Sequence, residues 1–275
     1  MSKKTIGIIG FGNMGSAIAE QIKSSYTVSV FDKDKNKTQD VCGLKVAENI
    51  QELVKSNEVV ILAVKPQDVD SVLEEIKPIK IRSLISIAAG ISTSYLKKRL
   101  GEVRVVRAMP NLPIKVGKGV ICIAEDTLEP EDRLLSVIGA YDSLGRIFYI
   151  QEKMMNAATA VSGSGPGFFF VLVESIPAGE RERFAKEIFA PSLSAAAQAV
   201  GFDKEMAQEI SIETALGSLA LLEKSGLSLE ALCARVTSKG GTTEAGLKKL
   251  QGNIEYLSEA VEAAKERAEE LSKKE

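Results

Sequence analysis

Apolar residues follow different patterns in the two halves of the chain. In the first half, short runs of apolar and often β-branched residues alternate with stretches in which apolar residues recur at helical spacing. The runs lie at residues 5–9, 27–31, 44–47, 59–64, 84–89, 103–108, 119–124 and 145–150. Strands that alternate with helices form a parallel sheet covered on both faces. The pattern therefore predicts an α/β domain of about eight strands, with a further helix around residues 131–141.

From residue 152 onwards the strand pattern stops and only helical spacing remains. Helices are predicted over residues 206–222, 228–235 and 243–250. Near the C-terminus, apolar residues recur at alternating intervals of three and four at Ile254, Leu257, Val261, Ala264, Ala268 and Leu271. Such a narrow stripe suits either a partner helix or packing within the same chain. We therefore expect a boundary near Gln151, with an α/β domain at residues 1–151 and an all-helical domain at residues 152–275.

The charge balance favours a small-molecule partner. The 275 residues include 35 lysines and arginines against 37 aspartates and glutamates, and a net charge of −2 attracts neither nucleic acid nor an anionic membrane. The three cysteines lie far apart without a CxxC pair, which argues against a disulfide framework and a thiolate metal site. The sequence shows no signal-peptide pattern and no apolar run of membrane-spanning length. We expect a cytoplasmic protein without a nucleic-acid, membrane or metal partner.

A glycine-rich motif, Gly10-Phe11-Gly12-Asn13-Met14-Gly15, follows the first predicted strand and begins a helix. In this position the first glycine makes the turn, the second lets a pyrophosphate approach the backbone, and the third lets helix and strand pack closely. Asp32 ends the second predicted strand, 22 positions after Gly10, where an acidic residue would bond the adenosine ribose. The motif therefore predicts a dinucleotide-binding domain of the Rossmann type.

The residues after the second strand leave NADH and NADPH both open. Asp32 favours NADH, because its carboxylate would bond the ribose 2′-hydroxyl and repel a 2′-phosphate. Lys33, Lys35 and Lys37 follow directly and could offset this repulsion. The acid alone favours NADH.

A second glycine motif lies near the C-terminus. Gly240 and Gly241 let successive backbone N–H groups converge on an anion, and Ser238, Thr242 and Thr243 add hydroxyl donors. A helix follows, so its free N–H groups would face the same point. The segment is predicted to bind a carboxylate, although a simple turn with a helix cap is the alternative.

This second motif resembles the C-terminal signature of the pyrroline-5-carboxylate reductases over Val-Thr-Ser-x-Gly-Gly-Thr-Thr-x-Ala-Gly-Leu at residues 236–247. Residues 63–67 (Ala-Val-Lys-Pro-Gln) and 107–111 (Arg-Ala-Met-Pro-Asn) resemble family motifs that line the dinucleotide site, and residues 162–166 (Ser-Gly-Ser-Gly-Pro) resemble one beside the nicotinamide ring. With Asn49, which begins a predicted capping box, the predicted cofactor-binding residues are Gly10, Phe11, Gly12, Asn13, Met14, Gly15, Asp32, Lys33, Asn49, Ala63, Val64, Lys65, Pro66, Met109, Pro110, Asn111 and Ser164.

The resemblance implies NAD(P)H-dependent reduction of 1-pyrroline-5-carboxylate to L-proline, the last step of proline biosynthesis. The implied substrate-binding residues are Ser238, Gly240, Gly241, Thr242 and Thr243. Since the chain contains no histidine, another group must handle the proton on the ring nitrogen. Thr243 is the implied catalytic residue, either as proton donor or by positioning the substrate.

The resemblance also implies a homodimer or a multiple of dimers, formed through interleaved helical domains. The cradle at residues 238–243 of one subunit would then lie close to the nucleotide domain of the other. The aromatic residues 168–170 are expected in the core or an interface.

The sequence departs from the family pattern at three places. Leu112 stands where the family usually has threonine, Lys239 stands where it has proline, and the connection between Glu174 and Leu193 looks longer, as though a charged helical piece were inserted or a helix broken. Reduction of another cyclic imino acid by this chain therefore stays open as an alternative. A β-hydroxyacid dehydrogenase would need a lysine on the helix after the Ser-Gly-Ser-Gly-Pro turn, and residues 166–176 contain none. A non-catalytic dinucleotide sensor would not need the hydroxyl-rich cradle.

Overall fold

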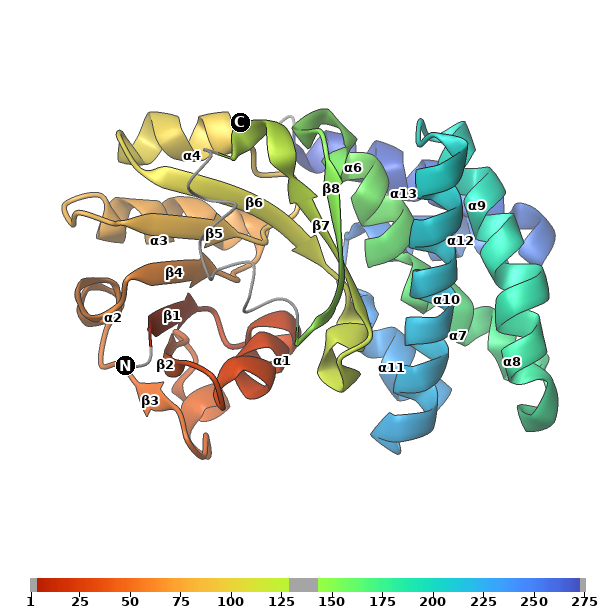
Figure 1. The fold of residues 1–275 in the computed structure, drawn as a ribbon, viewed down its shortest axis with the longest axis horizontal. Helices are drawn as coiled ribbons and strands as arrows, with labels where there is room; N and C mark the ends of the chain where they lie inside the picture. The colour runs from red at the N-terminus through yellow and green to blue at the C-terminus, as the bar shows by residue number, and fades with distance from the viewer. Residues whose placement is uncertain (1–3, 129–142, 273–275) are drawn as a thin grey trace.

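The computed structural model describes residues 4–128 and 143–272. Its N-terminal half is a sheet with helices packed on it, and its C-terminal half is a bundle of helices beside the last strands of that sheet (Figure 1). The eight-stranded sheet has the order β3-β2-β1-β4-β5-β6-β7-β8. The predicted fold class, an α/β region followed by an all-helical one, is confirmed.

Most predicted strands form where the apolar runs lie. The strands are β1 (Thr5–Ile9), β2 (Thr27–Phe31), β3 (Lys45–Val46), β4 (Val59–Leu62), β5 (Ser83–Ser86), β6 (Arg104–Pro110), β7 (Gly119–Ala124) and β8 (Gly145–Ile150). β4 ends two residues before the predicted end, and the helical turn η2 (Pro66–Asp68) begins four residues after Leu62. The helix predicted around residues 131–141 lies outside the described residues.

The alternation of strands and helices predicts a fully parallel sheet, but one pair of strands is antiparallel. β6 pairs with β7 antiparallel, whereas the other paired strands are parallel. The connection between β6 and β7 is the short helical turn η3 (Leu112–Val116), which ends at Gly117 with φ 67°. A connection of this length reverses the chain and is too short for the crossover that a parallel pair needs.

Helices cover both faces of the sheet because alternate strand residues point to opposite sides. Ile8 packs in one apolar cluster with Ile18 of α1 (Asn13–Ile22). Its neighbour Ile9 packs in another with Leu53 of α2 (Ile50–Ser56). The second cluster also includes α3 (Val69–Ile76) and α4 (Thr93–Leu100). The carboxyl ends of β1, β2 and β4 thus meet at one edge, where a ligand can bind.

The C-terminal half consists of helices and helical turns. They are η5 (Glu152–Met154), α6 (Met155–Ala158), the π-helical turn η6 (Thr159–Gly163), α7 (Gly165–Leu172), η7 (Val173–Ser175), η8 (Ala178–Glu180), α8 (Arg181–Arg183), the π-helical turn η9 (Phe184–Phe189), α9 (Ala190–Ala199), α10 (Lys204–Ser225), α11 (Leu229–Val236), α12 (Thr242–Leu250), η10 (Ile254–Tyr256) and α13 (Leu257–Ser272).

The connection after Glu174 contains a break in the helix and then further helical structure. The backbone becomes extended at Ile176 and Pro177, and helical structure then runs from η8 to the end of α9. The turn η9 widens to π geometry just before Pro191, a residue without a backbone N–H to continue the helical ladder. Phe168, Phe169 and Phe170 are buried, and Phe169 packs against Phe184 and Phe189 of this segment, so the aromatic triplet belongs to the core.

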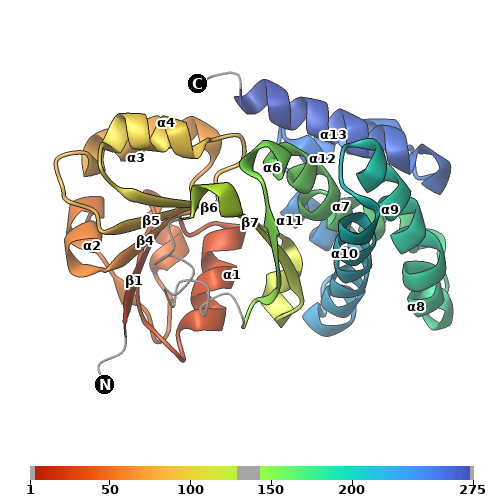
Figure 2. The same cartoon turned by 45° about the horizontal axis from the view of Figure 1, so that its top comes forward.

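The narrow apolar stripe of the last helix is buried within the same chain. Leu257, Val261, Ala264 and Ala268 of α13 are buried in the core of the helical half. α13 contacts α12 and α9, and Figure 2 shows it lying across the ends of these helices. Of the two uses that the pattern left open, the structure shows packing within the same chain, because neighbouring helices of that chain cover the stripe.

One continuous helical stretch, Glu152–Ser175, is long and apolar enough to cross a membrane by length and composition. Within the described residues, 83% of its most apolar window is buried inside the protein. The stretch therefore forms the core of the helical bundle.

Candidate active site

The three motif glycines of the first turn have different surroundings. Gly10 has φ 97°, and a Cβ there would lie 2.7 Å from the carbonyl oxygen of Ala63. A Cβ at Gly15 would lie 2.0 Å from the carbonyl oxygen of Gly10, so turn and helix are in direct contact there. A Cβ at Gly12 would meet no described atom within 4 Å. The first and third glycines therefore shape the loop, and the second leaves open space above the backbone.

The loop leads into a helix start that can receive an anion. α1 begins at Asn13 with Gly12 as its N-cap, and no side chain of the described residues caps it. Its first turn contains no acidic residue. The first N–H groups of a helix have no intrahelical acceptor, and the helix dipole is positive at this end. A pyrophosphate would therefore find donors and favourable charge beside the open space at Gly12.

Asp32 is bonded to the glycine loop and to its own strand end. Its Oδ2 accepts a hydrogen bond from the N–H of Phe11 at 2.7 Å, and its Oδ1 accepts one from Asp34 at 2.9 Å. Lys37 Nζ lies 3.2 and 3.3 Å from the two oxygens. Burial alone raises the pKa of this carboxyl, but the bonds from Asp34, Phe11 and Lys37 outweigh burial and hold the pKa below its ordinary value. Asp32 is thus an ionised group that fixes the loop.

A cavity of about 430 Å³ brings many of the predicted cofactor residues together. Those that line it are Gly10, Gly12, Asp32, Lys33, Ala63, Val64 and Lys65. Within it, Lys33 Nζ lies 2.6 Å from Asp68 Oδ1. Asn49 lies with Asp32 on a neighbouring cavity of about 650 Å³. The Asn49 side chain accepts a hydrogen bond from the N–H of Glu52 at 2.8 Å, and the Glu52 carboxylate accepts one from the N–H of Glu48. In a capping box the second bond would come from the N–H of Asn49 itself, so the predicted cap forms with its second bond shifted by one residue.

The cradle near the C-terminus is a tight turn at the start of α12. Gly240 has φ 70°, and its N–H donates to the Glu244 carboxylate. The N–H of Gly241 donates to the carbonyl oxygen of Ser238 at 2.9 Å. Both glycine N–H groups predicted to hold a carboxylate thus have acceptors inside the loop, because the turn closes on itself. The N–H groups that start α12 lie one residue further on, at Thr242 and Thr243, where no described side chain caps the helix.

Three hydroxyl groups meet beside this helix start. Thr243 Oγ1 donates to Ser164 Oγ at 3.1 Å, although the two residues are 79 positions apart. Ser164 Oγ and Thr242 Oγ1 are also 3.1 Å apart. Thr243 is 4% exposed and Ser164 is fully buried. The turn at residues 162–166 and the cradle therefore form one polar cluster at the edge of the core.

Two side-chain amides tie this cluster to the N-terminal half. Asn13 Nδ2 in the glycine loop donates to the carbonyl oxygen of Arg235 at 2.9 Å, at the end of α11 (Leu229–Val236). Asn111 Nδ2 donates to the carbonyl oxygen of Ser162 at 3.0 Å, and its Oδ1 accepts the N–H of Val120 at 2.8 Å. The glycine loop, the end of β6 and the cradle are thus held together.

No sequence motif marks Arg235, which is 222 positions from its partner Asn13. No motif marks Lys115 either. Burial, and then the nearby charge of Arg235, lowers the pKa of Lys115. Only the packing of the two halves brings Lys115 and Arg235 close together.

Comparisons with known proteins match both halves of the chain. The family model for pyrroline-5-carboxylate reductase dimerisation matches residues 152–271, and the model for NADP oxidoreductase, coenzyme F420-dependent, matches residues 5–90. Pyrroline-5-carboxylate reductase of Aquifex aeolicus is 34% identical over 252 residues, which cover 90% of this chain and 88% of the relative. That of Methanosarcina acetivorans is 32% identical over 291 residues and covers 100% of both chains.

Solved structures give the same match. Pyrroline carboxylate reductase of Plasmodium falciparum with NADP bound is 29% identical, with a TM-score of 0.63 and coverage of 99% of both chains. The pyrroline-5-carboxylate reductase of Coxiella burnetii is 30% identical, with a TM-score of 0.62 and coverage of 98% of this chain and 99% of that chain. The alignments run almost end to end while the superpositions are moderate, so some elements of these chains are placed differently.

Proposed function

The chain belongs to the pyrroline-5-carboxylate reductase family, and we propose that its reaction takes place where the start of α12 meets Ser164 and the glycine loop. The protein is an NAD(P)H-dependent oxidoreductase that reduces 1-pyrroline-5-carboxylate to L-proline, the last step of proline biosynthesis. The observation that carries the placement is the hydroxyl cluster, in which Thr243 donates to Ser164 at 3.1 Å. Asn13 ties the same region to the glycine loop.

The residues of the N-terminal half fit a dinucleotide. The open space at Gly12 and the uncapped start of α1 suit a pyrophosphate. Asp32, Lys33 and Asn49 lie at the cavities on the adenosine side. Residues 63–66 and 109–111 would line the path toward Ser164, which would lie at the nicotinamide end. When bound, the reduced nicotinamide supplies a hydride to the carbon of the C=N bond.

The substrate carboxylate would lie at the start of α12. The N–H groups of Thr242 and Thr243 and the hydroxyl of Ser238 would hold it, helped by the positive end of the helix. Glu244 already occupies the N–H of Gly240, so that glycine and Gly241 shape the turn rather than donate. Holding the substrate in one orientation next to the hydride donor supplies much of the rate gain in such reactions.

Thr243 is best suited to position the substrate. Its hydroxyl proton is engaged with Ser164, and a threonine hydroxyl is a weak acid. The ring nitrogen would therefore take its proton from water, or the substrate would bind as the protonated iminium. The hydroxyls of Ser164, Thr242 and Thr243, which bond to one another, would orient the ring.

Loss of reduced-nicotinamide absorbance tests the activity directly. We expect the highest kcat/KM with 1-pyrroline-5-carboxylate, a lower value with the six-membered homologue, and no oxidation of hydroxyacids in the reverse direction. A higher kcat/KM with the six-membered homologue would mean that the substrate has a six-membered ring and that the type of reaction is the same. Activity with hydroxyacids alone would overturn the assignment.

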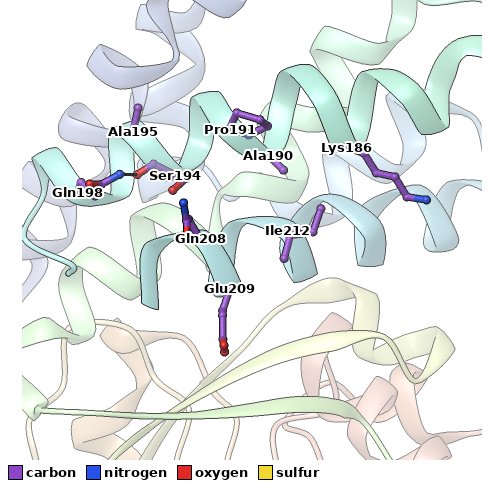
Figure 3. Close-up of a pocket in the computed structure, with 9 residues that line it drawn as sticks. All are labelled: Lys186, Ala190, Pro191, Ser194, Ala195, Gln198, Gln208, Glu209 and Ile212. Atoms are coloured by element: carbon purple, nitrogen blue, oxygen red, sulfur yellow. Dashed lines mark hydrogen bonds between the residues drawn. The ribbon is translucent and has the colours of Figure 1, made fainter. Parts of the chain in front are cut away.

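The oligomer is proposed to be a homodimer or a multiple of dimers. The region that matches the dimerisation model spans residues 152–271 and includes a groove of about 420 Å³ between α9 and α10. Figure 3 shows Ser194 and Gln208 facing one another across it, with Ala190 and Ile212 further along the same two helices. We propose that a second copy covers this groove.

Light scattering at micromolar concentration tests the dimer. The wild type should show the mass of two chains or a multiple of it, and Ile212→Glu, which places a charge on the wall of the groove, should lower that mass. Lys204→Glu, an exposed change at the start of α10, is the matched control and should leave the mass unchanged. A single-chain mass for the wild type would contradict the proposal.

The proposed compartment is the cytoplasm. All three cysteines are unpaired, which suits a reducing environment. Burial raises the pKa of the Cys122 thiol to about 12 and also raises that of Cys233. Cell fractionation tests this placement, and recovery of the enzyme outside the cytoplasmic fraction would contradict it.

A further inference from the structure

A carboxylate attaches the first helical run, residues 152–164, to the sheet. Glu152 begins the run, and its side chain is 20% exposed. Its Oε1 accepts hydrogen bonds from the N–H of Thr93 at 2.8 Å and from Arg107 Nη1 at 3.3 Å, and its Oε2 accepts one from the Thr93 hydroxyl at 2.7 Å. Thr93 begins α4, and Arg107 lies in β6 with a side chain that is 6% exposed. The carboxylate thus joins the run to two elements of the N-terminal half, through bonds that are largely shielded from water.

The run is attached to the end of β6 a second time, at a carbonyl group without a helical donor. In an α-helix the carbonyl of Ser162 would accept the N–H of residue 166, but Pro166 has no N–H. The N–H of Gly167 donates to the carbonyl of Ser164 instead. Asn111, which directly follows β6, donates its Nδ2 to the Ser162 carbonyl at 3.0 Å. A side chain at the strand end therefore replaces the missing helical donor.

The two attachments set the direction and the register of the run. On the strand side they are four residues apart in extended backbone, which spans about 13 Å. On the helical side they are ten residues apart, which spans about 15 Å. Because the two lengths agree and both residue numbers rise together, the run lies along β6 in the same direction. Met109, between the two strand positions, belongs to one apolar cluster with Met155 of the run. One attachment would let the run slide or turn against the strand, whereas two prevent this.

Ser164 takes its position from this run. Its N–H donates to the carbonyl oxygen of Thr159 at 2.9 Å, five residues back, which is the bond of a π-helical turn. Thr159 lies between the two attachments. The Ser164 hydroxyl then meets those of Thr242 and Thr243. A shift of the run at Glu152 would therefore move this hydroxyl relative to the end of β6.

We propose that Glu152 is a positioning residue for the reaction. Through Arg107 and Thr93 it sets the register of the first helical run along β6, and with it the distance from Ser164 to the nicotinamide end of the dinucleotide. The inference rests on the proposed function for the role of Ser164. The negative charge matters because removal of one member of a shielded ion pair leaves the other charge uncompensated. Displacement of a reacting group by about 1 Å can lower a rate about 100-fold.

A single-turnover measurement separates placement from stability. Enzyme in excess over NADH is mixed with saturating 1-pyrroline-5-carboxylate, and the loss of NADH absorbance is followed. The amplitude counts the NADH bound to folded enzyme, whereas the rate constant reports hydride transfer. Glu152→Ala should lower the rate constant about 10- to 100-fold and leave the dissociation constant of NADH within about twofold of the wild type. An unchanged rate constant, whatever the amplitude, would overturn the proposal.

A milder variant and a matched control accompany this measurement. Glu152→Gln keeps the shape and an acceptor for Thr93 but loses the charge opposite Arg107, so the rate constant should fall about three- to tenfold. Glu213→Ala removes an ion pair at 3.1 Å between Arg146 of β8 and α10, which also joins the two halves but does not involve the first helical run. This control should keep the wild-type rate constant. Equal losses in the glutamine variant and the control would contradict a specific role of Glu152.

Hydrogen exchange tests the same positioning without substrate. In Glu152→Gln, the amides of residues 159–165 should exchange at least about fivefold faster than in the wild type, while those of β1 stay unchanged. Unchanged protection of residues 159–165 would overturn the proposal even if the wild type is fully active. Faster exchange in that segment, with a wild type that is inactive toward 1-pyrroline-5-carboxylate, would support the positioning by Glu152 and count against the proposed substrate alone.

Discussion

The two halves of the molecule build their parts of the site by different means. The N-terminal half uses backbone: Gly10 and Gly15 allow a tight turn, and Gly12 leaves space above it. The helical half uses side-chain hydroxyls from segments far apart in the sequence, such as Ser164 and Thr243. The first half should therefore be sensitive to an added Cβ, and the second to the loss of a hydroxyl or of the packing that places it.

The largest expected effect separates two glycines of the same loop. Gly15→Ala places a Cβ 2.0 Å from a backbone oxygen and should lower the free energy of unfolding by about 3 kcal/mol, with loss of dinucleotide binding. Gly12→Ala should leave stability unchanged and weaken dinucleotide binding roughly tenfold, because its methyl group would occupy the place of the pyrophosphate. Urea unfolding and a fluorescence titration with NADH measure both. Equal losses of stability would break the distinction.

Removing one hydroxyl from the helical half should affect turnover instead. Thr243→Ala should lower kcat roughly 10- to 100-fold by loosening the substrate, with dinucleotide affinity unchanged. Thr243→Ser keeps the hydroxyl and should stay within about threefold of the wild type. A positioning role predicts that the pH dependence of kcat keeps its shape in both variants. Loss of one limb of the profile in the alanine variant alone would assign Thr243 a proton-transfer role.

The bond between the halves should matter less than either site. Asn13→Ala removes the bond to Arg235 but keeps the backbone of the loop, so kcat/KM for the imino acid should fall about tenfold while dinucleotide affinity changes less than about twofold. Gln21→Ala is the matched control, because its amide donates to the carbonyl oxygen of Lys115 at 2.7 Å within the N-terminal half. Equal effects of the two variants would show that the bond to Arg235 has no special role.

The smallest effect concerns the choice of cofactor. Lys37 faces Asp32 and offsets its charge, so Lys37→Ala should raise the KM for NADPH about fivefold and change that for NADH little. Lys77→Ala, at an exposed helix end, is the control. Equal losses with both cofactors would mean that Lys37 acts only by holding Asp32.

Sequence reasoning succeeds where the cause is local. The strands β1, β2, β7 and β8 coincide with their apolar runs, and the glycine motif sits between β1 and α1 as its spacing requires. Bonds between distant segments could not be predicted. Periodicity gives no partner for Asn13, and a stripe such as that of α13 has the same pattern whether the covering helix belongs to the same chain or to another.

Two features that differ from the predictions have local causes that can be found in the sequence. The turn η3 between β6 and β7 is too short for a crossover, so the antiparallel pair follows from the connection length. The glycines at 240 and 241 indicate converging N–H groups, yet Ser238 and Glu244 within the same segment supply acceptors for them. Local acceptors compete with a ligand for the same donors.

The apolar stretch Glu152–Ser175 also has a consequence for protein synthesis. It leaves the ribosome before α9, α10 and α13, which later contact its helices. Until those helices are made, the nascent chain presents a surface of the kind that chaperones bind or that aggregates. A gene truncated before α13 would therefore leave this stretch partly uncovered, and the damage would come from insolubility in addition to the loss of one helix.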